Sequence, residues 1–144
     1  GNTHAEYKVK DGKIYLIEVA ARGAGGSISS KVIPYLTGFD PLEALLRTLI
    51  GQVFEVETTS YENRYAILKF FNFSPGRIKK VHINEDLLEE DVIVFSLDVM
   101  DGDHIRSIED SRDRLGYFIV CGMERDGVLQ REKMVESAVQ IEYY

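Results

Sequence analysis

The stretch that decides the fold is residues 3–26, which read THAEYKVKDGKIYLIEVAARGAGG. Apolar and polar side chains alternate over residues 3–9 and 13–20, on either side of Asp11-Gly12. An Asp-Gly pair between two such segments is typical of a two-residue hairpin turn, because both central positions need a positive φ. The stretch therefore predicts an antiparallel hairpin at the start of the chain.

This hairpin carries two acidic residues, Glu6 and Glu18. Strands of equal length on both sides of the turn bring these two residues to nearly opposite positions, within reach of a shared cation. Strict alternation also predicts that Leu16 lies on the same face as Glu18. The alternative is that both acids are solvated strand residues balanced by neighbouring lysines, because charged residues are mostly exposed.

An arginine and a glycine-rich loop follow the second strand directly. Arg22 is followed by Gly23-Ala24-Gly25-Gly26-Ser27, which leads into a predicted helix and has no Gly-Lys-Ser/Thr sequence of a Walker A loop. Free backbone N–H groups at a helix start can bind anions, and an arginine can neutralise charge that develops in phosphoryl transfer. Mg²⁺ prefers one or two carboxylates together with phosphate oxygens. The combination favours nucleotide-dependent chemistry, with a plain turn as the alternative for the loop.

His4 lies two residues before Glu6 and therefore on the same strand face. It is a candidate for a residue that contacts substrate or supports a metal ligand. The alternative is a structural histidine.

Two helices are predicted after the loop. The hydroxyl groups of residues 27–30 offer caps for a short helix over about residues 29–37. Asp40-Pro41-Leu42-Glu43 then predicts a second helix with Asp40 as N-cap and Glu43 completing a capping box. Its apolar residues recur at helical spacing up to a stop at Gly51, and they are Leu42, Leu45, Leu46, Leu49 and Ile50.

The pattern changes to strands after residues 52–63, which are polar and predict a boundary. Strands are predicted over residues 65–72, 77–83, 92–99 and 116–121, followed by an amphipathic helix over about 126–138 and a strand over 140–144. We therefore expect an α+β fold with mainly antiparallel strands. The expected domains are residues 1–52 and residues 53–144.

The composition narrows the function classes. The chain has 144 residues and a formal charge of −7, which argues against a general nucleic-acid binder. A single cysteine, Cys121, lies in an apolar run and is expected to be a buried structural thiol. No signal peptide and no long apolar span is recognised, so the expectation is a cytoplasmic protein without membrane contact.

Two further charged segments have simple structural interpretations. Asp98, Asp101 and Asp103 lack the closing glutamate of an EF-hand, which favours a solvated turn. The segment 111–116 reads SRDRLG, and we expect a loop held by arginine–carboxylate pairs, with docking to another domain as the alternative.

At Glu6, Glu18 and Arg22 the sequence resembles the last part of the catalytic domain of the ATP-grasp superfamily. The commonest form of that motif reads Glu-x-Asn-x-Arg, whereas this chain has Ala20 at the asparagine position. Glu-Val-Ala-Ala-Arg resembles instead the L-amino-acid ligase branch, which is related to carbamoyl-phosphate-synthase-like ligases. Weaker similarities to such carboxylate–amine ligases continue at residues 37–40, 74–78 and 113–117.

The resemblance implies a role for each matching residue. Glu6 and Glu18 would hold Mg²⁺ (or Mn²⁺) against the phosphates of ATP, and Arg22 would contact the transferred phosphoryl group. The backbone of Gly25 and Gly26 would stabilise the tetrahedral centre formed when the amine attacks. The implied function is an ATP-dependent carboxylate–amine ligase that acts on small-molecule substrates through an acyl-phosphate.

The sequence contains no candidate for the nucleotide-contacting lysines or the glycine-rich lid that such an enzyme needs. We therefore expect the chain to be the C-terminal part of a longer ligase, inactive in isolation. The replacement of asparagine by Ala20 supports an alternative, a non-catalytic binding or regulatory domain derived from the same scaffold. A third interpretation is an interaction module whose early acids are only surface charge. Exposed strand edges would also allow a homodimer.

Overall fold

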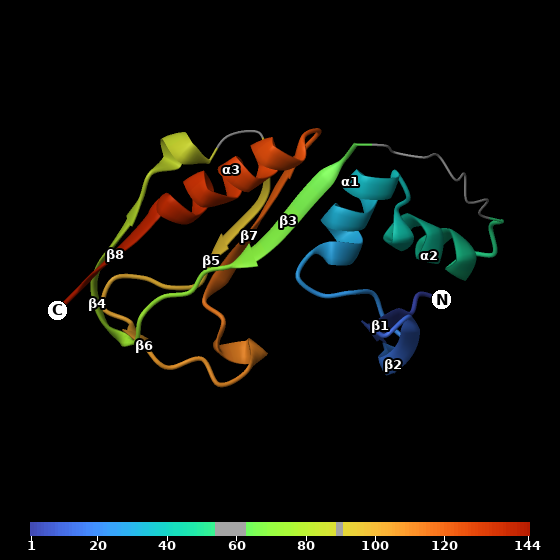
Figure 1. The fold of residues 1–144 in the computed structure, drawn as a ribbon, viewed down its shortest axis with the longest axis horizontal. Helices are drawn as coiled ribbons and strands as arrows, with labels where there is room; N and C mark the ends of the chain where they lie inside the picture. Colours follow the sequence, from blue (N-terminus) through green and yellow to red (C-terminus); the bar gives the residue numbers. More distant parts are fainter. Residues whose placement is uncertain (54–62, 89–90) are drawn as a thin grey trace. The chain divides into compact units, whose positions relative to one another are not determined.

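The computed structural model describes residues 1–53, 63–88 and 91–144, and the chain divides into two compact units, Gly1–Tyr61 and Glu62–Tyr144 (Figure 1). The architecture is α+β, and all strand pairs are antiparallel, as the sequence predicts. The expected domain boundary between residues 52 and 53 adjoins residues 54–62, which lie outside the described part of the chain.

The N-terminal unit begins with the predicted hairpin, formed by strands β1 (His4–Lys10) and β2 (Lys13–Ala20). Asp11 and Gly12 have φ angles of 52° and 69°, which are the two positive values that the hairpin turn requires. A five-residue π-helical segment, Ile28–Val32, continues directly into helix α1 (Ile33–Thr37), and helix α2 (Pro41–Leu49) follows.

The start of α2 is largely as predicted. Asp40 Oδ1 accepts hydrogen bonds from the N–H groups of Leu42 (2.8 Å) and Glu43 (3.1 Å), and Pro41 occupies the first turn. The Glu43 carboxylate does not close a capping box. It instead accepts from Arg47 at 2.6 Å, one turn further along the helix.

The predicted cap of the preceding helix is wrong. Ser27 is the N-cap of the π-helical segment but has a φ of 59° and makes no side-chain capping bond. The hydroxyl of Ser29, which is buried, instead accepts a hydrogen bond from the N–H of Ala24 at 2.7 Å. This serine ties the glycine-rich loop to the helical segment that follows it.

The C-terminal unit contains two three-stranded sheets. The first has the order β3 (Tyr65–Phe70), β7 (Gly116–Gly122), β5 (Val92–Leu97). The second has the order β6 (His104–Ile105), β4 (Gly76–Ile83), β8 (Val139–Tyr143), and its two-residue strand β6 was not predicted. Helix α3 (Arg125–Ser137) packs on β7 and β3 and leads directly into β8 (Figure 1).

The core of this unit lies between α3 and the first sheet. The residues predicted to face inward from the last helix are all buried: Val128, Val135, Ala138 and Val139. They pack with aromatic and β-branched side chains of the sheet, among which Phe71, Phe118 and Val120 are buried. Burial of these side chains supplies the main stabilising free energy of the unit.

Three strands carry a one-residue β-bulge. In β2 the extra residue lies between the partners of Glu6 and Tyr7. In β4 the register shifts between Ile78 and Lys80, and in β5 it shifts between Val92 and Val94. A bulge adds one residue to one strand, so the alternation of side chains restarts beyond it. In β5 it places Val92 and Phe95, three residues apart, on the same core-facing side.

Candidate functional site

The two acids of the hairpin are direct cross-strand partners. Tyr7 pairs with Leu16, but the next residue of β1, Glu6, pairs with Glu18, so that Ile17 is the extra residue of the bulge. Both carboxylates are more than half exposed. Side chains of cross-strand partners lie on the same face of a sheet. The hairpin therefore presents two adjacent carboxylates to the same side.

The bulge also sorts the hairpin into two chemically distinct faces. Because Leu16 pairs with Tyr7 and Glu18 pairs with Glu6, Leu16 and Glu18 lie on opposite faces, and the prediction of a shared face is wrong. One face carries the charged residues, and its cross-strand pairs are His4 with Ala20, Glu6 with Glu18, Lys8 with Tyr15 and Lys10 with Lys13. The other face is apolar and consists of Ala5, Tyr7, Val9, Ile14, Leu16 and Val19.

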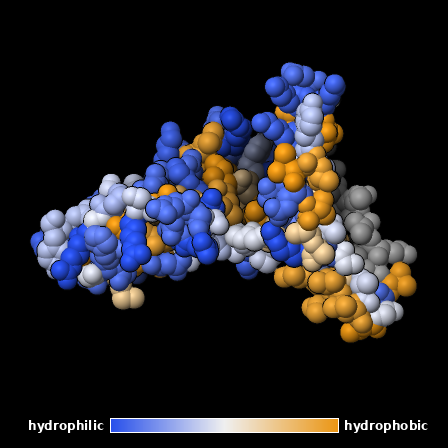
Figure 2. All heavy atoms as spheres, turned by 90° about the horizontal axis from the view of Figure 1, so that it is seen from below, coloured by the Kyte–Doolittle hydropathy of each residue, from blue (hydrophilic) through white to orange (hydrophobic). Residues whose placement is uncertain are grey.

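The apolar face of the hairpin lies open in the N-terminal unit. Its five large side chains are each more than half exposed: Tyr7, Val9, Ile14, Leu16 and Val19. The predicted apolar stripe of α2 is similarly exposed, since Leu46, Leu49 and Ile50 are each more than 60% accessible. Figure 2 shows hydrophobic residues on the surface of this unit. Exposed apolar surface of this kind is typical of a region that binds a partner, a ligand or a membrane.

A histidine and an arginine flank the acid pair. His4 Nε2 lies 3.3 Å from Glu6 Oε1, and Arg22 Nη2 lies 3.7 Å from Glu18 Oε1. Arg22 also donates to the carbonyl oxygen of Gly23 at 3.0 Å, which holds the guanidinium at the entrance of the glycine-rich loop. The structure thus brings His4, both acids and Arg22 together at the base of the hairpin.

The glycine-rich loop is shaped by close backbone contacts. A Cβ atom on Gly23 would lie 2.8 Å from the Ser29 hydroxyl oxygen, so the loop approaches this serine too closely for a larger residue. Gly26 has a φ of 59°, a left-handed value that favours glycine. Within the described part of the chain, the N–H groups of Gly25 and Gly26 have no hydrogen-bond acceptor. They are therefore free to donate to a ligand.

The donor set at the acid pair fits a cation that takes few protein ligands. Among the described residues, no group of three or more histidine, cysteine, aspartate or glutamate side chains is arranged to hold a metal ion. Glu6 and Glu18 provide two carboxylates, and the position opposite His4 is occupied by Ala20, which has no donor. Mg²⁺ bound through one or two carboxylates, water and substrate phosphate needs no more than this.

Two of the other acidic candidates, Asp101 and Asp103, have structural roles. Asp101 Oδ1 accepts from the N–H of Val81 at 2.7 Å, and Asp103 Oδ2 accepts from the N–H of Met100 at 2.9 Å. These bonds fix the turn around Gly102, whose φ is 93°. The interpretation of this segment as a turn agrees with the structure.

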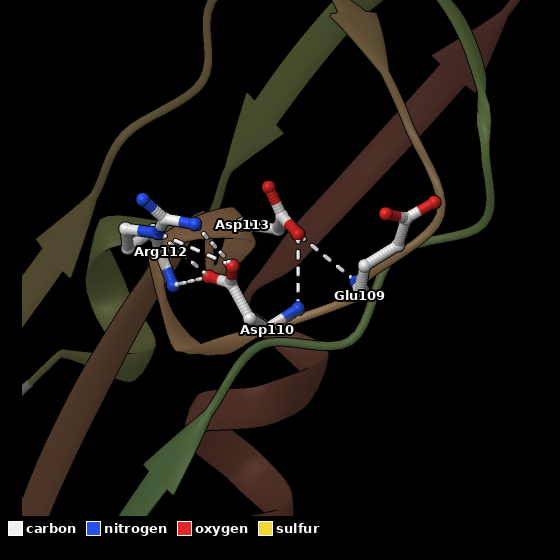
Figure 3. Close-up of polar contacts among 4 residues, drawn as sticks. All are labelled: Glu109, Asp110, Arg112 and Asp113. Carbon is white, nitrogen blue, oxygen red and sulfur yellow. Dashed lines mark hydrogen bonds and ion pairs between the residues drawn. The ribbon is translucent and has the colours of Figure 1, made fainter.

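The charged loop before β7 is held by its own acids and arginine (Figure 3). Asp113 Oδ2 accepts from the N–H groups of Glu109 (2.9 Å) and Asp110 (3.0 Å), and Arg112 pairs with Asp110 at 2.7 Å. The Arg112 guanidinium lowers the pKa of the Asp110 carboxyl. Arg114 lies 4.0 Å from the centre of the Phe70 ring. The predicted arginine–carboxylate loop is therefore present.

Sequence reasoning missed several polar contacts between distant residues. Lys69 on β3 bonds Glu132 at 2.5 Å and Glu136 at 2.8 Å, both on α3. Their only sequence signal is the four-residue spacing of the two glutamates on one helix face.

In the described part of the chain, no helix is long and apolar enough to cross a membrane.

Comparison with known proteins places the chain in a ligase family. Residues 69–144 match the family model of the L-amino acid ligase C-terminal domain 2. The chain belongs to this family.

Two solved structures share the fold over 99% of the chain. Phosphoribosylglycinamide synthetase from Anaerococcus prevotii is 18% identical with a TM-score of 0.79, and L-amino acid ligase from Bacillus licheniformis is 20% identical with a TM-score of 0.77. The chain spans 37% and 36% of the length of these two proteins. No curated protein matches the sequence. The expected relationship to the ATP-grasp ligases is thus confirmed by the family match of residues 69–144 and by the shared fold.

Proposed function

We propose that the chain is part of an ATP-dependent carboxylate–amine ligase, in which residues 1–52 complete the catalytic domain and residues 53–144 form a C-terminal domain. The observation that carries the proposal is the direct pairing of Glu6 with Glu18, next to Arg22 and the glycine-rich loop. Acids, a fixed cation and free N–H groups are what phosphoryl transfer and acyl transfer require. Two paired acids count against the interpretation of Glu6 and Glu18 as unrelated surface charges.

In the proposed reaction, an oxygen of the substrate carboxylate attacks the γ-phosphorus of ATP, which forms an acyl-phosphate and releases ADP. The amine nitrogen then attacks the acyl carbon, and the carbon–oxygen bond to phosphate breaks after the amine proton is lost. Mg²⁺ (or Mn²⁺), when bound, would neutralise charge on the phosphates. Glu6 and Glu18 would hold this ion.

The remaining residues would act on developing negative charge. Arg22 is fixed by Glu18 and by the carbonyl oxygen of Gly23, so its guanidinium would contact the transferred phosphoryl group without reorganising. The free N–H groups of Gly25 and Gly26 would donate to the oxyanion of the tetrahedral centre. His4, hydrogen-bonded to Glu6, would orient that carboxylate.

The exposed apolar surfaces support the proposal that the working protein is longer. The apolar face of the hairpin and the stripe of α2 would be covered by the part of the ligase that precedes this chain and supplies the nucleotide-binding lysines and lid. The substrates would be a small carboxylate and a small amine, in the cytoplasm. In isolation the chain would not turn over ATP.

The test uses the full-length protein, mixtures of carboxylates and amines, and release of ADP and phosphate. We expect turnover that Glu18→Gln reduces by more than about 10-fold, since loss of a metal ligand removes charge stabilisation. Glu43→Gln is the matched control, because Glu43 contacts Arg47 on α2. Equal activity of both variants would contradict the role of Glu18.

A second candidate is a non-catalytic domain that binds a nucleotide or regulates a partner. The observation that favours it is Ala20, which lies opposite His4 where the commonest ATP-grasp motif has an asparagine ligand. Isothermal titration of Mg-ATP into the full-length protein separates the two. Binding heat accompanied by turnover supports the ligase, whereas binding without ADP release under any substrate mixture supports the second candidate.

A further inference from the structure

Strand β8 forms an open edge of the second sheet. It is the outer strand in the order β6-β4-β8, and of the described elements only β4 and α3 contact it extensively. An edge strand presents unpaired N–H and C=O groups that can pair with another chain.

The hydrogen bonds to β4 fix the direction of these groups. The N–H of Asn84 donates to the carbonyl oxygen of Ala138, and the N–H of Tyr144 donates to the carbonyl oxygen of Arg77. Both bonds involve even-numbered residues at the ends of β8. Because backbone groups alternate in direction along an antiparallel strand, the odd-numbered residues direct theirs to the open edge, and these are Val139, Ile141 and Tyr143.

We propose that β8 pairs with β8 of a second copy of this chain, antiparallel, about a twofold axis at Ile141. In this register Ile141 faces the partner's Ile141, and Val139 faces the partner's Tyr143. Each of these pairs joins two outward-facing residues, so each exchanges both N–H···O bonds. A shift by one residue would pair outward with inward groups, and a shift by two would shorten the overlap of the five-residue strand.

The side chains agree with this register. On the solvent face, Gln140 meets the partner's Glu142, a non-hydrogen-bonded pair whose side chains lie close together. Glu142 already pairs with Lys79 and lies 4.0 Å from His82. The side-chain amide of the partner's Gln140 would donate a further hydrogen bond to the Glu142 carboxylate and would bring no second negative charge near it. On the other face, the apolar row from Val81 through Ile141 continues into the partner.

An open pocket at the start of β8 supports the same arrangement. It has a volume of about 490 Å³ and is lined by residues that include His82, Asn84, Leu87, Ala138 and Gln140. The register places the partner's Tyr144 opposite Ala138. Tyr144 is 79% exposed in a single copy. In the dimer, the ring of the partner's Tyr144 would cover this pocket, and its hydroxyl would lie near the polar groups of His82 and Asn84. The inference goes beyond the proposed ligase function and does not rest on it.

Sedimentation of the 144-residue chain over a concentration series tests the proposal. We expect a monomer–dimer equilibrium. Gln140→Glu places a carboxylate opposite the partner's Glu142 in both symmetry-related pairs and should weaken the dimerisation affinity about 10-fold. Gln140→Lys places opposite charges there and should strengthen the affinity roughly several-fold. Gln140 is exposed, so both variants should fold.

Gln130→Glu and Gln130→Lys, at an exposed position of α3, are the matched controls and should leave the equilibrium unchanged. A chain that stays monomeric up to about 0.5 mM would overturn the proposal. So would a dimer that responds equally to the Gln140 and Gln130 substitutions, which is the result expected if the exposed hairpin mediates the association.

Discussion

Glu18 lies opposite Glu6 because β2 has one residue more than β1 between the hairpin turn and this pair. Counting outward from Asp11-Gly12 in a regular hairpin, Glu6 would pair with Ile17, and Glu18 would fall on the apolar face. The bulge at Ile17 therefore keeps both carboxylates on the charged face and the apolar residues on the other. The position of both proposed metal ligands on one face of the hairpin therefore depends on the one extra residue in β2.

Deletion of Ile17 is expected to preserve the pair, because the shortened strand then reaches Glu18 opposite Glu6 without a bulge. Insertion of one alanine between Ile17 and Glu18 should separate the two acids, since the strand would need a second extra residue to keep them paired. Cross-strand nuclear Overhauser effects between residues 6 and 18 report the pairing. We expect them in the deletion variant and not in the insertion variant.

The reverse pattern would show that the bulge itself, and not the residue count, sets the register. The fold of both variants is checked by the signals of the C-terminal unit, which should not change.

A close backbone contact predicts an intolerant glycine in β7. Gly116 has a φ of 135°, and a Cβ atom there would lie 2.9 Å from Leu97 Cα on the neighbouring strand β5. Gly116→Ala should lower the free energy of unfolding by about 3 kcal/mol, from overpacking and backbone strain. Gly127→Ala, in helix α3 where an added Cβ atom would lie at an ordinary contact distance of 4.0 Å from Glu124 Cβ, should raise it by about 0.5–1 kcal/mol. Urea unfolding measures both.

The contact of Lys69 with Glu132 and Glu136 predicts a pH-dependent contribution to stability. The hydrogen bonds that the Lys69 ammonium donates to the Glu132 and Glu136 carboxylates raise the pKa of Lys69. The contribution to stability is thus complete below the pKa of Lys69 in the unfolded chain, about 10.4. It is lost as the pH rises through the higher pKa of Lys69 in the folded chain. Lys69→Met should cost about 0.5–1 kcal/mol at neutral pH, a figure discounted for solvent screening.

The difference between wild type and Lys69→Met should vanish in strongly alkaline solution, as measured by urea unfolding at a series of pH values. Lys133→Met, at an exposed position of α3, serves as control and should show no such convergence. A Lys69→Met difference that is independent of pH would mean that packing, and not charge, accounts for the effect.

Cys121 is buried as predicted, and burial raises its pKa to about 11. Since the thiolate is the reactive form, the folded chain should react with a thiol reagent at pH 8 at least about 100-fold more slowly than the chain in denaturant. Ser107→Cys introduces an exposed thiol and should add one equivalent that reacts rapidly. Rapid reaction of the native wild-type chain would contradict the burial.

The sequence was sufficient for the elements that local chemistry determines. The hairpin turn at Asp11-Gly12, the capped start of α2 at Asp40 and the buried face of α3 follow from turn propensity, capping and helical spacing. The pairing of Glu6 with Glu18 was close to predicted, since near-equal strand lengths already place the two acids near each other.

The bulges were not predicted, because they are decided by which face each side chain buries over the whole strand. Their signal was nevertheless present as apolar residues three apart in β2, β4 and β5, and these are Leu16 and Val19, Ile78 and Val81, and Val92 and Phe95. The role of Ser29 and the contact of Lys69 with α3 depend on tertiary packing, which no local pattern encodes.

The central claim is that Glu6 and Glu18 together hold a divalent cation for ATP-dependent ligation, and the most direct test is Mn²⁺ binding to the full-length protein in the presence of ATP, followed by electron paramagnetic resonance. We expect wild type and Glu43→Gln to bind Mn²⁺ with equal affinity. Glu6→Gln and Glu18→Gln should each weaken binding by at least about 10–100-fold, because loss of a metal ligand costs no less than loss of a residue that supports a ligand, for which this range is typical. Unchanged Mn²⁺ affinity in both hairpin variants would contradict the account.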